Sequence, residues 1–159
     1  MTFERMESAV RWLRISFWVG AVVDAVAGLQ MLSPRLFALG MGLDDFHPGP
    51  DYRYAMGMGA ALMFGWTALL LWADRRPVAR RDVLLLTVFP VIVGLGANQA
   101  FGVASGFLPA PFAAPIWALQ FVLAGLFLTS WRRASRLRTA WPRRARTPGD
   151  ERRQEHILL

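Results

Sequence analysis

The chain has 159 residues, of which 55% are hydrophobic, and its mean hydropathy is +0.33. This composition is too apolar for an ordinary soluble domain and indicates a membrane protein. The formal charge is +7, all 18 basic residues are arginines, and there is no cysteine. The lack of cysteine excludes thiol nucleophiles, thiolate metal sites and disulfides.

Four long apolar runs follow one another, and each is close to the ~20 residues that a helix needs to cross a bilayer. They predict an all-α integral membrane four-helix bundle with helices over residues 13–32, 54–72, 83–102 and 112–131. Pro90 predicts a kink in the third helix. We expect residues 1–133 to form the membrane domain and residues 134–159 to be a basic, disordered cytoplasmic tail.

The arginines predict the orientation of the bundle, because short loops rich in positive charge stay on the cytoplasmic side. They gather before the first helix, in the loop over residues 75–82 and after the fourth helix. Both termini are therefore expected in the cytoplasm, in a bacterial inner membrane. A signal-peptide cleavage site at Ala25-Val26-Ala27 is the competing interpretation, but the apolar run continues past it and Glu4 and Glu7 dilute the basic start.

Asp24 interrupts the apolar run of the first helix, ~3 Å to the outer side of its centre. A carboxylate is costly at this depth, so we expect it to face the bundle interior, where Gly20 and Gly28 leave room. The same count places Gln120 near the middle of the fourth helix and Asn98 ~7 Å outward of the middle of the third. We predict an interhelical polar cluster of Asp24, Asn98 and Gln120, with Gln99 and Gln30 as outer members.

Two roles for this cluster remain open. It either holds a ligand or serves as hydrogen-bond glue, worth ~0.6 kcal/mol per contact. Arg53 and Asp51 are placed at the outer mouth of the bundle. Because Arg53 lies ~12 Å above Asp24, we expect its partner to be Asp51 or a lipid headgroup.

Several further patterns in the sequence predict no additional site. The Gly-rich triplets at 40–42, 57–59 and 94–96 do not open a helix after a strand, so nucleotide binding is rejected. Asp44, Asp45, His47 and Asp51 match no metal-ligand spacing, and no metal site is predicted. Small-residue stripes on the second and third helices indicate close packing, within the bundle or in a homo-oligomer.

The tail holds nine arginines between residues 132 and 153. Beside a membrane, each is expected to be attracted to anionic lipid headgroups by ~1 kcal/mol. Nucleic-acid binding is not predicted, because no module would position the nucleic acid.

The order of elements resembles a known family. The segment AGLQMLSPRLFALG joins a small-residue helix to a short amphipathic connection, and YRYAMGMGAAL opens the second helix before a tight third and fourth. Over residues 11–133 this order is similar to that of the small DoxX-like four-helix membrane proteins of bacteria. The resemblance implies their fold, and some members are associated with quinone-linked oxidation, but no catalytic motif is carried over.

We therefore expect a multi-pass membrane protein that binds a lipid-like molecule or a quinone. The predicted contacts are Asp24, Asn98, Gln120 and Gln99, with Arg53 and Asp51 at the mouth. The alternative is a structural or accessory subunit of a membrane complex, with a membrane-protein partner and no ligand of its own. A lone carboxyl without a nucleophile, a metal or a second titrating partner favours a binding protein over an enzyme.

Overall fold

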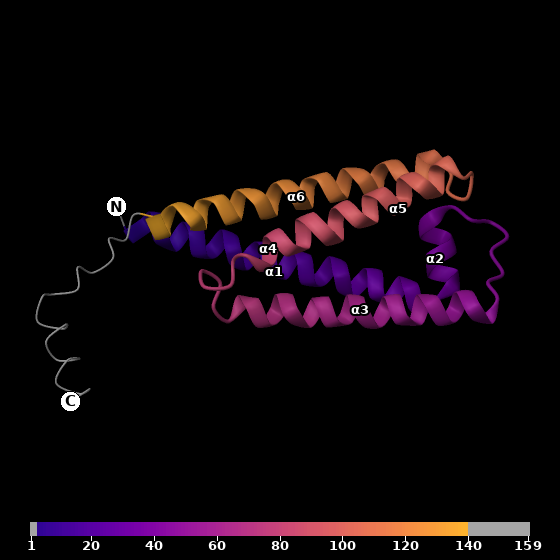
Figure 1. Ribbon diagram of the computed structural model, residues 1–159, viewed down its shortest axis with the longest axis horizontal. Helices are drawn as coiled ribbons and strands as arrows, with labels where there is room; N and C mark the ends of the chain where they lie inside the picture. Colours follow the sequence, from indigo (N-terminus) through magenta and orange to yellow (C-terminus); the bar gives the residue numbers. More distant parts are fainter. Residues whose placement is uncertain (1–2, 140–159) are drawn as a thin grey trace, which may run out of the picture.

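The computed structural model describes residues 3–139, and this part of the chain contains helices and no strand (Figure 1). A single long helix, α1, opens the chain and another, α6, closes the described part. In chain order the elements are α1 (Phe3–Leu32), α2 (Pro34–Met41), α3 (Pro50–Asp74), α4 (Val83–Leu86), the π-helix η1 (Thr87–Ile92), α5 (Val93–Ala104) and α6 (Ala110–Thr139).

Helix α1 lies at the centre of the packing. It contacts α3 on one side and α6 on another, and α6 in turn packs against α4, η1 and α5. The start of α1, the loop between α3 and α4 and the end of α6 lie at one end of the bundle (Figure 1). We call this the arginine end, because the loop carries Arg75, Arg76, Arg80 and Arg81. Helix α2 marks the opposite end, which we call the α2 end.

Four helical spans in the described residues are long and apolar enough to cross a membrane. They are Met6–Leu32, Pro50–Asp74, Val83–Ala104 and Ala110–Arg136. This confirms the predicted all-helical fold with four membrane-length helices. The helix ends differ from those predicted: α1 begins well before residue 13, and α6 continues past the predicted end at residue 131 to Thr139. Most of the predicted tail, residues 140–159, lies outside the described residues.

The third span departs from a regular α-helix where the proline predicted a kink. Pro90 has no N–H to donate, and the chain around it widens into the π-helix η1 before the α-helix resumes at Val93. A π-turn holds an additional residue, and each residue turns an α-helix by about 100°. The faces of α5 are therefore rotated relative to those expected from a continuous helix.

Local capping fixes the short helix α2. Pro34 stands at its first turn, and the Ser33 hydroxyl accepts a hydrogen bond of 3.4 Å from the Leu36 amide. At the other end Gly42 adopts a left-handed conformation with φ of 66°, which glycine adopts at little cost. These two caps turn the chain across the α2 end of the bundle and place α2 beside the start of α3.

The interior is built from residues of all four spans. Large members of this core are Leu13 and Phe17 of α1, Leu70 of α3, Leu84 of α4 and Phe127 of α6, each no more than 1% exposed. Many large apolar side chains point outward instead, with Leu62 at 74% and Phe121 at 78% exposure. A surface of this kind suits a lipid environment and not water.

Candidate functional site

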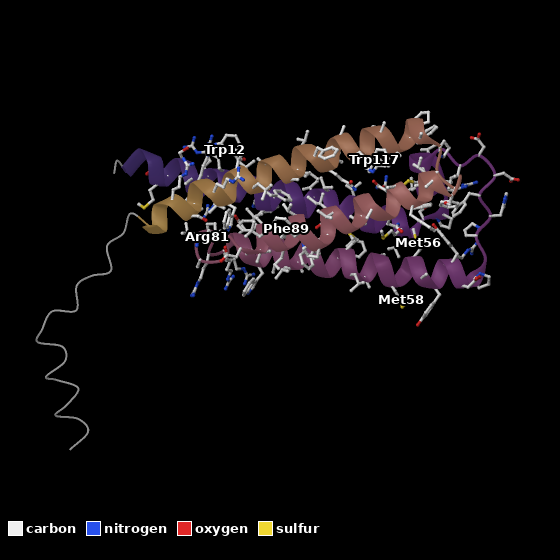
Figure 2. The ribbon with its side chains drawn as sticks, turned by 45° about the horizontal axis from the view of Figure 1, so that its top comes forward. Trp12, Met56, Met58, Arg81, Phe89 and Trp117 are labelled. Carbon is white, nitrogen blue, oxygen red and sulfur yellow. The ribbon has the colours of Figure 1, made fainter. Side chains whose placement is uncertain are left out.

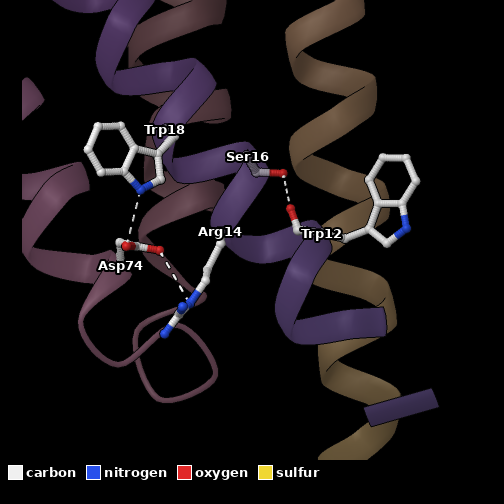
Figure 3. Close-up of polar contacts among 5 residues, drawn as sticks. All are labelled: Trp12, Arg14, Ser16, Trp18 and Asp74. Atoms are coloured by element: carbon white, nitrogen blue, oxygen red, sulfur yellow. Dashed lines mark hydrogen bonds and ion pairs between the residues drawn. The ribbon is translucent and has the colours of Figure 1, made fainter. Parts of the chain in front are cut away.

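A serine pair joins α1 to α6 near the arginine end. Ser16 Oγ donates a hydrogen bond of 2.8 Å to Ser130 Oγ, and both side chains are fully buried. Ser16 also lies 2.9 Å from the Trp12 carbonyl oxygen, a contact drawn in Figure 3. The Ser130 hydroxyl reaches the same carbonyl at 3.4 Å. This cluster is fully packed, and its geometry is that of helix-to-helix attachment rather than of a site.

Asp74 forms a second attachment at this end. Its Oδ2 accepts a 3.3 Å hydrogen bond from Trp18 Nε1, and its Oδ1 lies 3.9 Å from Arg14 Nε (Figure 3). Both partners belong to α1, whereas Asp74 is the last residue of α3. The contacts thus hold the end of α3 against α1.

Tryptophans and charged groups also pair elsewhere around the arginine end. Trp131 Nε1 donates a 2.8 Å hydrogen bond to Asp82, and the Arg80 guanidinium lies 3.3 Å from the ring centroid of Trp72. Desolvation lowers the pKa of Arg80 from its ordinary value, and the nearby Arg76 and Arg75 lower it further. Amphipathic indoles paired with charges are typical of the boundary between a membrane and water.

Asp24 lies inside the bundle, as predicted, on the same face of α1 as Gly20 and Gly28. A Cβ at Gly20 would lie 3.0 Å from Phe127 of α6, and one at Gly28 would lie 3.1 Å from Phe64 of α3. Asp24 stands midway between these two contacts and is only 9% exposed. Its Oδ2 is buried and has no hydrogen-bond partner in the described part of the chain. The carboxyl therefore does not serve as glue through this oxygen.

The structure places two other members of the predicted cluster, Gln120 and Gln30, near different helices. Gln120 turns toward α5, because its Oε1 lies 3.3 Å from the position of a Cβ at Gly96. Gln30 turns toward α2, with its Nε2 3.4 Å from the corresponding position at Gly40. The Oε1 of Gln99 is buried but has no hydrogen-bond partner among the described residues. Their role as ligand contacts stays a prediction.

Asn98 is the one correction to the geometry of this cluster. Its side chain is exposed on the outer surface of α5, so it does not meet Asp24 inside the bundle. The neighbouring Gln99 takes the partly buried position instead. The physical reason is η1, because the π-turn changes which residues of the following helix face inward.

A pocket opens at the α2 end, between the end of α1, helix α2 and the start of α3. Its volume is about 160 Å³. Most of its wall is apolar, and its polar side chains are Tyr52 and Arg53, at the start of α3. The lining residues are Met31, Leu32, Pro34, Phe37, Tyr52, Arg53, Met56 and Gly57.

Three aromatic rings pack together beside the pocket, and two of them, Phe37 and Tyr52, line it. The Tyr52 ring lies 6.1 Å from Phe37 of α2 and 5.2 Å from Phe46 of the following loop, while Phe37 and Phe46 lie 5.6 Å apart, between ring centroids. The two contacts of Tyr52 are edge-to-face, and together the three ring contacts stabilise the fold-back of α2 onto α3. Figure 2 shows Met56 on the bundle side of α3 and Met58 on the opposite side. Sequence reasoning missed Phe37, Tyr52 and Met56.

The two residues predicted at the outer mouth, Arg53 and Asp51, have different surroundings. Arg53 lines the pocket, and it takes part in none of the ion pairs of the described residues, which are Arg14–Asp74, His47–Asp45 and Arg81–Asp82. Asp51 lies in the first turn of α3 with its Oδ1 directed toward Gly49. A carboxylate there stabilises the helix N-terminus, so the expected pairing of Arg53 with Asp51 is absent.

A second, more open hollow of about 320 Å³ lies beside Met6, Glu7, Val10, Arg11 and Arg14. All of these residues belong to α1, so the hollow has only one wall and is not a candidate site. Within the described residues, no three imidazole or carboxylate side chains lie close enough together to hold a metal ion.

Comparisons of the chain with family models, curated proteins and solved structures gave no match.

Proposed function

We propose that the chain is a multi-pass membrane protein that binds the head of a lipid-like molecule or a quinone in the pocket at the α2 end. The observation that carries this proposal is the composition of the pocket. Methionine, leucine and aromatic side chains form its wall, and a guanidinium without an ion-pair partner among the described residues lies beside a phenol at its edge. An amphiphilic ligand matches both parts.

The polar edge favours a ligand head that accepts hydrogen bonds. Arg53 has only donors to offer, and the Tyr52 hydroxyl can donate as well. A carboxylate, a phosphate or a quinone carbonyl would each satisfy these groups, and an anionic head would gain a charge-assisted hydrogen bond. The resemblance to DoxX-like proteins, which we also propose, favours the quinone among these candidates.

The volume limits how much of the ligand enters. Sites that enclose a whole drug-sized molecule measure roughly 300 Å³ or more, whereas this pocket holds about 160 Å³. The pocket therefore accommodates a head or a single ring, and an attached chain would extend along the apolar surface of the helices. A hydrocarbon tail is stable there if the surrounding medium is lipid.

Asp24 lies deeper than this pocket. Phe64 and Met63 of α3 pack against Gly28, which is between Asp24 and the pocket residue Met31 along α1. We therefore assign the polar end of the ligand to Arg53 and Tyr52. Contact of a ligand with Asp24 would require Phe64 to move, so Asp24 is a second polar position that a ligand reaches only by entering further.

We also propose an orientation in which the arginine end is cytoplasmic and the α2 end faces outward, in the inner membrane of a bacterium. The concentration of arginine at one end supports it. The pocket then opens at the outer boundary of the membrane, where amphiphiles have their heads.

A ligand-dependent melting experiment tests the proposal. Purified wild type, Arg53→Ala and Arg35→Ala are melted in one detergent, with and without dodecanoic acid or a benzoquinone bearing a decyl chain. Arg35 is a matched control, because it is an exposed arginine of α2 outside the pocket lining. We expect at least one ligand to raise the melting temperature of wild type and Arg35→Ala but not that of Arg53→Ala. An equal rise in all three proteins, or no rise in wild type, would contradict the proposal and favour an accessory subunit without a ligand.

A further inference from the structure

Asn98 places an amide on the outer surface of a membrane-length helix. It lies within the span Val83–Ala104, and its side chain is exposed. Gly94, Ala97 and Phe101 lie on the same face of α5 at helical spacing and are also exposed. A position ~7 Å from the middle of the span is still inside a hydrocarbon core about 30 Å thick.

This amide has no partner in the described part of the chain. No hydrogen bond of Asn98 to another described residue is present. Thr129 of α6 offers a contrast, because it is also exposed but donates to the carbonyl oxygens of Gly125 at 2.8 Å and Leu126 at 3.0 Å. An amide surrounded by hydrocarbon has no water to bond with. Its hydrogen-bonding groups must therefore be satisfied by another molecule.

We infer that a second copy of this chain covers this face, with α5 packed against α5 around a twofold axis. The carboxamide of Asn98 is self-complementary, since it carries both a donor NH₂ and an acceptor oxygen. Two copies facing each other therefore satisfy both amides with reciprocal hydrogen bonds, as an isologous interface requires. This inference is independent of the ligand pocket.

The surroundings of Asn98 permit the close approach that such a pair needs. A Cβ at Gly94, one turn before Asn98, would meet nothing within 4 Å. Ala97 adds only a methyl group, so two α5 helices can come together along this line. Phe101, three residues after Asn98 on the same face and 72% exposed, would cover the amides on one side.

Single-cysteine crosslinking tests the contact directly, because the natural chain has no cysteine. Ala97→Cys keeps Asn98 and places a thiol beside it, and Ala61→Cys places one on the exposed face of α3 at a similar depth. Membranes containing either variant are treated with a mild oxidant. We expect a covalent dimer with Ala97→Cys, in several-fold excess over Ala61→Cys. Equal crosslinking at both positions, or a dimer with Ala61→Cys alone, would overturn the inference.

A second measurement tests whether the Asn98 amide itself stabilises the dimer. The dimer fraction of wild type, Asn98→Gln and Asn98→Leu is followed in liposomes over a range of protein-to-lipid ratios. Loss of two interhelical hydrogen bonds predicts about tenfold weaker association for Asn98→Leu, with Asn98→Gln intermediate. Dimers of unchanged strength in Asn98→Leu would overturn the role of the amide. A wild type that is monomeric at every ratio, or an Ala97→Cys variant that crosslinks to a different membrane protein, would overturn the second copy as the occupant.

Discussion

Ser16 and Ser130, which are 114 residues apart in the chain, share a 2.8 Å hydrogen bond at the contact between α1 and α6. Both are fully buried, so neither can exchange this bond for one to water. In a membrane protein such polar contacts add to packing where the hydrophobic effect between helices is absent. The pair therefore contributes to holding the first and last spans together.

Replacing either serine of this pair by alanine is expected to lower the free energy of unfolding by about 1 kcal/mol. In a double-mutant cycle the two substitutions should show a coupling of about 0.6 kcal/mol, the mean for such bonds in membranes. Unfolding by a denaturing detergent measures these values. Thr129→Ala is the control, because the hydrogen bonds of Thr129 to described residues stay within α6. A coupling of zero would show that the serines contribute independently.

Asp74 should stabilise the contact of α3 with α1 through its two oxygens. Asp74→Ala removes both the Trp18 hydrogen bond and the Arg14 ion pair, whereas Asp74→Asn keeps an acceptor for the indole. We expect Asp74→Ala to lose about 1 kcal/mol of stability and Asp74→Asn to lose less. Asp45→Ala is the comparison, since Asp45 is exposed and its ion-pair partner among the described residues is His47. Equal losses in Asp74→Asn and Asp74→Ala would assign the effect to the ion pair alone.

Asp24→Leu is expected to raise the melting temperature. Its buried Oδ2 has no hydrogen-bond partner in the part of the chain that the structure describes, so a leucine removes an unsatisfied polar group from the interior. Asp24→Asn should stay near wild type. Thermal unfolding in one detergent measures all three proteins. A lower melting temperature for Asp24→Leu would mean that the carboxyl stabilises the bundle.

The proposed orientation, with the arginine end in the cytoplasm, can be tested by cysteine labelling, because the natural chain has no cysteine. Asp45 lies in the exposed loop after α2 and Ala79 in the exposed loop after α3. In intact cells a membrane-impermeant thiol reagent should label Asp45→Cys and not Ala79→Cys. After the cells are opened it should label both. Labelling of Ala79→Cys alone in intact cells would reverse the orientation.

The sequence was sufficient for the spans, because length and hydropathy determine which segments can cross a bilayer. The interior position of Asp24 was also predictable, since a carboxyl flanked by glycines has few other places in an apolar helix. The orientation of Asn98 was not, because the π-turn around Pro90 rotates the helix after it. The depth of a residue along a helix can be counted from the sequence. The face of the helix on which it lies also depends on whether each preceding turn is a regular α-helical turn.

The pocket was beyond sequence reasoning for a different reason. It exists only because Phe37, Phe46 and Tyr52 bring α2 back onto the start of α3. These three rings belong to separate segments, and no periodicity relates them. Arg53 and Asp51 were predicted at this mouth, and of the two only Arg53 lines the pocket.

Native mass spectrometry of the protein in mild detergent tests ligand binding in this pocket most directly. Met56→Trp places a bulky ring in the pocket, and Met58→Trp makes the same change on the opposite side of α3 (Figure 2). A cooperative melting transition in each variant would show that both are folded. We predict a bound small molecule on wild type and Met58→Trp and its loss from Met56→Trp. A wild type without any bound molecule, or one retained equally by all three proteins, would contradict binding at the α2 end.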